Sequence, residues 1–99
     1  MTPEGRVKAK VKRAMVQFGP MVYQFMPVQN GMGAPGLDWF NCVNGRFIAI
    51  ETKAPGGKLT ARQLLTKQAI EKAGGLVFVV DGDASLTVAV NHIRALCLL

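Results

Sequence analysis

The chain has 99 residues, of which 49% are hydrophobic, and 12 Lys and Arg residues outnumber 6 Asp and Glu residues, giving a formal net charge of +6. This length predicts a single domain over residues 1–99, and the apolar content excludes a disordered chain. No apolar run approaches the roughly 18 residues that a membrane-spanning helix needs. The positive charge favours an acidic partner, with nucleic acid first, although it could also serve solubility alone.

The N-terminal residues and the two cysteines bear on where the protein is located and on whether it binds zinc. The first apolar residues are separated by basic ones, so no signal peptide is expected. Cys42 and Cys97 lie far apart, and the sequence contains no CxxC pair and no Cys/His cluster that would make a zinc site. We therefore expect reduced thiols, a cytoplasmic location and no membrane partner.

Residues 4–18 have the period of an amphipathic helix. Its apolar side chains recur every three or four residues, at Val7, Val11, Ala14 and Phe18. At about 100° per residue, Glu4 falls at the edge of this stripe, while most of the basic side chains fall opposite it. The Gly-Pro pair at 19–20 ends the helix, and residues 21–26 are predicted to form a strand.

Residues 30–36, NGMGAPG, are rich in glycine. A phosphate-binding loop is one interpretation. The stretch lacks the Gly-Lys-Ser/Thr ending of such loops and no helix is predicted after it, so a plain loop is favoured.

Residues 36–53 are predicted to form a hairpin around Asn44-Gly45, a strong signal for a two-residue type I′ turn. That turn sets Val43 opposite Arg46 and, counting outward, sets Asp38 opposite Glu51. Alternation divides the remaining residues between two faces. One face holds Phe40, Cys42, Phe47, Ala49 and Lys53, and the other holds Trp39, Val43, Ile48 and Ile50. Both faces are largely apolar, so we expect a central pair of strands.

The remaining elements complete an α/β pattern. Thr60 is the predicted N-cap of a helix over residues 61–73, which the Gly-Gly pair at 74–75 closes. Residues 76–80 are continuously apolar, as in a buried strand. Over residues 86–97 the apolar side chains recur at helical spacing, which predicts a last helix. A strand–helix–strand unit predicts a parallel pair. The order is therefore helix, three strands, helix, strand and a C-terminal helix, with a mixed sheet.

The two facing acids need an explanation. Like charges about 5 Å apart repel by about 3 kcal/mol at an effective dielectric near 20. A divalent cation such as Mg²⁺ or Mn²⁺ would remove the conflict, and Glu4 could reach the same site. Lys53 on the same face could orient a nucleophile or stabilise phosphoryl charge. The alternative is that Asp38 and Glu51 are solvated strand ends, with Lys53 as a salt-bridge partner.

Asp38, followed by a second strand and then ETK at residues 51–53, resembles the PD-(D/E)XK nuclease signature. The order of elements resembles the restriction-endonuclease-like core of that superfamily. Three further features resemble the VRR-NUC branch of this superfamily, the virus-type replication-repair nucleases. They are the short spacer between Asp38 and Glu51, the sequence KLTARQ at residues 58–63 and the sequence AGG at residues 73–75. The size is similar to that of the small stand-alone phage and bacterial members. Leu37 departs from the pattern, because it stands at the proline position of the signature.

The resemblance implies a single VRR-NUC nuclease domain that acts as a metal-dependent DNA endonuclease with Mg²⁺ or Mn²⁺. In such enzymes the acids matching Asp38 and Glu51 bind the metal. The main-chain carbonyl of the residue matching Thr52 and an acid of the first helix, here Glu4, complete the set. The lysine, here Lys53, positions or activates the attacking water.

The resemblance carries further expectations about the site and the substrate. It places the helix glutamine, here Gln63, near the site. By its similarity to the small stand-alone members, the chain is expected to form a homodimer that cuts branched DNA such as Holliday junctions. The expected location is the cytoplasm of bacteria or phage-infected cells. The alternatives are a flap or duplex nuclease of the same chemistry, or a non-catalytic junction-binding protein. The intact set of two acids and a lysine argues against the last of these.

Basic and aromatic side chains supply candidates for DNA contacts. The candidates for phosphate binding are Arg6, Lys10, Arg13, Arg46, Lys58 and Lys67. For Lys67 a solvated helix face is the competing interpretation. Trp39 and Tyr23 could stack on bases, but we expect both in the core.

Overall fold

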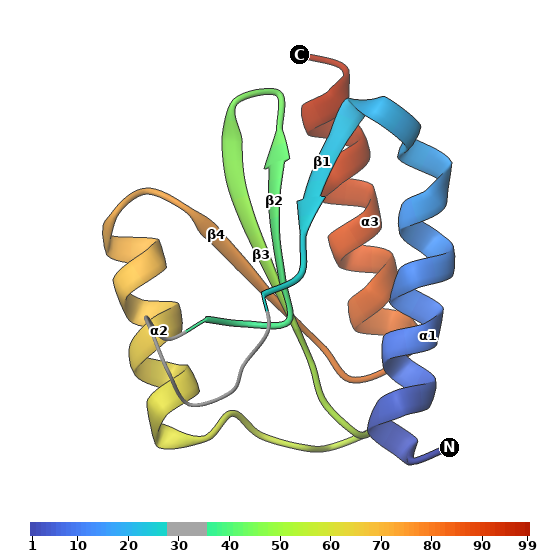
Figure 1. Ribbon diagram of the computed structural model, residues 1–99, viewed down its shortest axis with the longest axis vertical. Helices are drawn as coiled ribbons and strands as arrows, with labels where there is room; N and C mark the ends of the chain where they lie inside the picture. The colour runs from blue at the N-terminus through green and yellow to red at the C-terminus, as the bar shows by residue number, and fades with distance from the viewer. Residues whose placement is uncertain (28–35) are drawn as a thin grey trace.

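The computed structural model describes residues 1–27 and 36–99 as a four-stranded mixed sheet with helices on both faces (Figure 1). The elements in chain order are α1 (Pro3–Met15), the 3-10 helix η1 (Val16–Met21), β1 (Val22–Phe25), β2 (Trp39–Val43), β3 (Arg46–Thr52), α2 (Ala61–Lys72), β4 (Leu76–Val80) and α3 (Asp83–Cys97). The strands lie in the order β1-β2-β3-β4, with β4 parallel to β3 and the other neighbours antiparallel. The predicted α/β class and mixed sheet are confirmed. Most of the glycine-rich stretch at 30–36 lies outside the described residues.

Helices α1 and α3 pack together on one face of the sheet, and α2 lies on the other (Figure 1). The core lies between the sheet and the α1–α3 pair, because both helices turn their apolar stripes inward. Its largest fully buried side chains include Met15, Trp39, Ile48, Ile50 and Ile93. The predicted core position of Trp39 is confirmed. None of the helices among the described residues is long and apolar enough to cross a membrane.

The β2–β3 hairpin has the predicted register. Val43 pairs with Arg46 and Trp39 with Ile50, so β2 and β3 are the central strands of the sheet. Asn44 and Gly45 both adopt positive φ, at 51° and 77°, as a type I′ turn requires.

Asn44 also joins the hairpin turn to the end of α3. Its side-chain amide donates hydrogen bonds to the backbone carbonyls of Leu96, at 3.2 Å, and Leu99, at 2.9 Å. The Leu96 carbonyl also accepts the backbone N–H of Leu99, so the Asn44 amide adds a further bond there and ties the turn to the C-terminal residues that follow α3. One residue thus sets the register of the hairpin and fixes the turn against α3.

Three predictions at the edges of the fold were wrong. The first helix was predicted over residues 4–18, but α1 ends at Met15 and the chain continues as η1, in which Gly19 has a positive φ of 54°. The strand at 76–80 was predicted to be buried. It is an edge strand in which Val80 alone is fully buried. Tyr23 was predicted in the core, but its side chain is 72% exposed.

The coverage of the sheet explains the third difference, the exposure of Tyr23. Two helices cover one face and one helix covers the other, on the side of β4 (Figure 1). Aromatic residues of β1 on the α2 side therefore remain exposed, although their strand is apolar. Tyr23 and Phe25 are the examples.

We expect substitutions at Asn44 to separate the two roles of this residue. Asn44→Gly keeps the positive φ but loses both bonds to α3, and should lower the free energy of unfolding by about 1–2 kcal/mol. Asn44→Ala adds strain at positive φ and should lower it by about a further 1 kcal/mol. Urea denaturation measures both changes. Equal stability of the two variants would contradict the role of φ, and wild-type stability of both would contradict the contact with α3.

Candidate active site

The predicted site residues gather where β3 ends and where α1 and α2 begin. Figure 1 shows these three points at one end of the molecule, below the sheet. Asp38 immediately precedes β2, and Glu51 and Thr52 are the last two residues of β3. Lys53 follows β3, and its backbone N–H donates to the carbonyl of Val80 on β4.

Asp38 and Glu51 lie opposite each other, as the register requires. The backbone N–H of Asp38 donates to Glu51 Oε1 at 3.0 Å. The backbone N–H of Thr52 donates to Asp38 Oδ2 at 2.9 Å, and the Thr52 hydroxyl donates to the same oxygen. Each carboxylate is therefore held by the strand across from it, and Thr52, which is fully buried, fixes the orientation of Asp38.

Glu51 is a buried carboxyl group next to a second carboxylate. It is 4% exposed, and burial raises the pKa of its carboxyl from 4.5 to about 7, with a further contribution from the charge of Asp38. The backbone N–H of Asp38 and the ammonium group of Lys53 oppose this rise in pKa, and Glu4 adds slightly to it. Lys53 Nζ lies 3.8 Å from Glu51 Oε2, and its side chain is 11% exposed. Burial is therefore the main reason that the Glu51 carboxyl resists ionisation, and the Asp38 carboxylate adds to it.

Gln63 connects Glu51 to the start of α2. Its Nε2 donates to Glu51 Oε2 at 3.0 Å. Its Oε1 accepts the backbone N–H of Thr60, while Thr60 Oγ1 accepts the backbone N–H of Gln63, forming a capping box. Because the cap occupies Oε1, the amide turns its NH₂ group toward Glu51. The predicted N-cap at Thr60 is confirmed, and the same box orients a predicted site residue.

The donor set fits a divalent cation with water ligands. The carboxylates of Asp38 and Glu51 are hard oxygen donors, and a cation would offset the charge that raises the pKa of Glu51. Glu4 lies in the first turn of α1, near enough for its charge to affect Glu51. In the described parts of the chain, no group of three or more His, Cys, Asp or Glu side chains is close enough to hold a metal ion. An ion here would therefore take water, or a main-chain carbonyl such as that of Thr52, as further ligands.

Sequence reasoning missed Lys8. Its Nζ lies 3.4 Å from Asp38 Oδ1, so α1 contributes a cation as well as Glu4 to the site. A signal was present, because Lys8 follows Glu4 by four residues and therefore lies on the same side of the helix.

Two of the predicted DNA-binding residues are engaged in ion pairs with acidic side chains. Lys10 is paired with Asp83 at 2.9 Å, and Lys67 is paired with Glu71 at 3.1 Å within α2. The Lys67 pair agrees with the solvated helix face that was the competing interpretation. The remaining candidates, Arg6, Arg13, Arg46 and Lys58, are exposed.

Comparison with solved structures shows the same fold in a chain described as "VRR_NUC domain". The two structures align with a TM-score of 0.76 at 23% sequence identity, over 93% of this chain and 98% of the other. No model of a protein family matches the chain, and no curated protein matches it either. The chain therefore has the fold of a VRR_NUC domain along nearly its whole length, consistent with the resemblance seen in the sequence.

We expect the metal-free protein to lose stability as pH rises, because of Glu51. The unfolded chain ionises Glu51 near pH 4.5 and the folded protein near pH 7, so between these values the folded state holds the extra proton. The free energy of unfolding should therefore fall over this interval, by up to about 3 kcal/mol. Urea denaturation in EDTA from pH 4.5 to 8 measures this slope.

A pair of variants isolates the contribution of Glu51 to this slope. Glu51→Gln should remove it, whereas Glu71→Gln changes an exposed acid of α2 and should keep it. Subtracting the Glu51→Gln curve from the wild-type curve removes the pH dependence that the two proteins share. If the difference in the free energy of unfolding between the wild type and Glu51→Gln does not change with pH, the raised pKa of Glu51 is contradicted.

Proposed function

We propose that this chain is a metal-dependent DNA endonuclease that hydrolyses phosphodiester bonds with Mg²⁺ or Mn²⁺. One observation carries the proposal: Asp38 and Glu51 face each other at the end of the central strands, with Lys53 beside them. A protein that only binds DNA does not need a pair of facing carboxylates, one of them buried, whose mutual repulsion is unfavourable. The same arrangement argues against solvated strand ends, because Glu51 is 4% exposed.

Each residue of the site has a distinct role in this proposal. Asp38 and Glu51 hold the ion, with the Thr52 carbonyl and Glu4 as further ligands. A bound ion of this kind lowers the pKa of a bound water and stabilises charge on the phosphodiester. Lys53, which is nearly buried, orients the attacking water and stabilises phosphoryl charge. Gln63 keeps Glu51 in position through its amide.

DNA is the proposed partner, and branched DNA of the Holliday-junction type is the proposed preferred form. The net charge of +6 supports affinity for phosphates. The candidates for phosphate contact are Arg6, Lys10, Arg13, Arg46, Lys58 and Lys67. Flap or duplex DNA is the alternative substrate for the same chemistry.

We further propose a homodimer, which would offer two active sites to the two strands of a junction. Its support is an exposed aromatic face on the α2 side of the sheet, formed by Tyr23, Phe25, Phe40 and Phe47. Tyr23, Phe25 and Phe47 are 72%, 55% and 47% exposed. The rings of Phe40 and Phe47 lie 5.3 Å apart, centroid to centroid.

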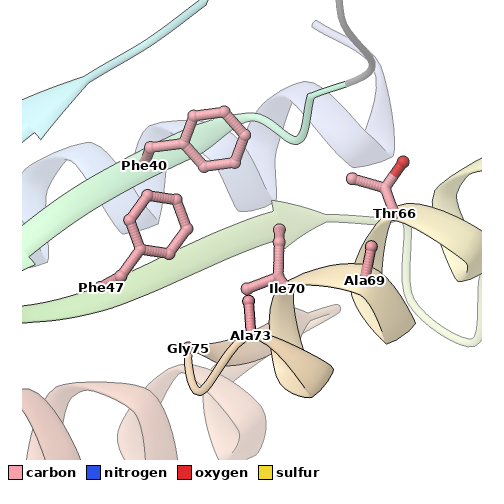
Figure 2. A pocket seen from close by; sticks show the side chains of 7 residues that line it. All are labelled: Phe40, Phe47, Thr66, Ala69, Ile70, Ala73 and Gly75. Atoms are coloured by element: carbon pink, nitrogen blue, oxygen red, sulfur yellow. The ribbon is translucent and has the colours of Figure 1, made fainter.

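The aromatic face continues into a pocket of about 430 Å³ between the sheet and α2 (Figure 2). Its lining is apolar apart from one hydroxyl: Phe40, Phe47, Thr66, Ala69, Ile70, Ala73 and Gly75. DNA gains little from an uncharged surface, whereas a second copy brings the same apolar surface to a two-fold interface. A second copy is therefore the occupant that we propose for the aromatic face.

We expect the purified protein to cut labelled DNA only when a divalent ion is present. A four-way junction, a flap and a linear duplex should be incubated with Mg²⁺, Mn²⁺ or EDTA, and the products separated on a gel. Asp38→Ala and Lys53→Ala should each lower the cleavage rate at least about a hundredfold while leaving DNA binding largely intact. Glu71→Gln serves as the control and should cut like the wild type.

The outcomes separate the competing functions. Binding of the junction without metal-dependent cleavage of any of the three DNAs would leave only the junction-binding alternative. Cleavage of flap or duplex in preference to the junction would favour the alternative substrates. Normal cleavage by both Asp38→Ala and Lys53→Ala would show that the site is assigned to the wrong residues.

We expect light scattering to give twice the chain mass of 10.7 kDa for the wild type. Phe25→Glu places a charge on the exposed aromatic face and should shift the protein to the monomer. Val88→Glu is the matched control, since Val88 is 62% exposed on α3, on the other side of the sheet. A wild-type monomer, or a dimer that tolerates Phe25→Glu, would contradict this interface.

A further inference from the structure

The ammonium group of Lys8 covers the open side of the Asp38 carboxylate. Its Nζ lies 3.4 Å from Asp38 Oδ1, with the Lys8 side chain 36% exposed and that of Asp38 19% exposed. The other oxygen, Oδ2, accepts hydrogen bonds from the backbone N–H and the hydroxyl of Thr52. Lys8 therefore contacts the oxygen of Asp38 that Thr52 leaves available to another ligand.

Lys8 and Lys53 are held very differently. Lys53 follows β3 directly, and its side chain is only 11% exposed, so the surrounding residues restrict its movement. Lys8 reaches Asp38 from α1 along a flexible four-carbon stem. Its distance of 3.4 Å exceeds the roughly 2.8 Å of a strong charge-assisted hydrogen bond, and partly exposed ion pairs of this kind are weak. Lys8 can therefore leave Asp38 easily.

The charge balance of the site would favour release of Lys8 from Asp38 when a divalent ion binds. Glu4, Asp38 and Glu51 together outnumber the ammonium groups of Lys8 and Lys53 by one when all are ionised. A divalent ion on the carboxylates would reverse this balance and repel Lys8 from Asp38 Oδ1. A DNA phosphate brought to the site would then be the nearest anion without a cation of its own.

We propose that Lys8 is a positioning residue that exchanges partners. It holds Asp38 Oδ1 in the metal-free protein, then releases this oxygen to a divalent ion and moves to a DNA phosphate beside the scissile bond. The proposal rests on the metal-dependent nuclease function proposed above. It makes Lys8 a competitor of the metal in the free protein and a partner of DNA in the complex.

Metal affinity in the absence of DNA tests the first half of this exchange. The probe is Mn²⁺ alone, with the free ion measured by electron paramagnetic resonance during titration with protein. Lys8→Met should bind Mn²⁺ about twofold to fivefold more tightly than the wild type, because the competing cation is gone. Lys8→Arg keeps the charge and should bind like the wild type. Lys72→Met is the control, an exposed lysine at the far end of α2.

The salt dependence of DNA binding tests the second half. Binding of a four-way junction is measured by fluorescence anisotropy over a range of salt concentrations, with Ca²⁺ as the divalent ion. Loss of one phosphate contact in Lys8→Met should reduce the slope of log K against log salt by about 0.9. Lys8→Arg should restore the slope, and Lys72→Met should leave it unchanged. A residue that merely stabilised α1 would not alter this slope.

The outcomes distinguish failure of this inference from failure of the nuclease function. If the wild type binds Mn²⁺ and cuts DNA, but Lys8→Met matches it in Mn²⁺ affinity or in salt slope, the exchange is overturned and the nuclease remains. If the wild type neither binds Mn²⁺ nor cuts DNA, both proposals fail. Circular dichroism confirms the fold of each variant, and Lys8→Gln replaces Lys8→Met if the latter does not fold.

Discussion

The register of the β2–β3 hairpin is the constraint on which the site depends. Asn44 and Gly45 adopt the positive φ values of a type I′ turn, and every pair along the two strands follows from that turn. A slip of one residue would send Asp38 and Glu51 to opposite faces of the sheet. The apolar residues would also change faces, so burial of Trp39 protects the register as well as the core.

The register brings together two carboxylates that a stable fold would otherwise keep apart. The structure surrounds them with five donors, which are the backbone N–H of Asp38, Thr52, Gln63 and the two lysines. These donors do not compensate fully for the burial of Glu51 and its proximity to Asp38, so the pKa of Glu51 remains raised. Such a site is unfavourable for stability in the absence of a ligand, which is typical of groups arranged for chemistry.

The helices cover the two faces of the sheet unequally, and this leaves the aromatic face exposed. The α1–α3 pair covers most of one face, and this face contains the core. Helix α2 has no fully buried residue, and the aromatic face beside it stays exposed. The candidate active site lies at the end of the central strands, and the aromatic face lies along the same strands on the α2 side.

The sequence by itself determined most of the elements, the hairpin register and the N-cap of α2, because each depends on neighbouring residues. Periodicity, Asn44-Gly45 and Thr60 were sufficient to place Asp38 opposite Glu51 and to start α2 after Thr60. Only the tertiary structure decided what each element packs against. Exposure of Tyr23 depends on the area that α2 covers, and contact between Lys8 and Asp38 depends on the angle of α1 to the sheet. Neither quantity is local to the chain, so periodicity and turn signals could not supply it.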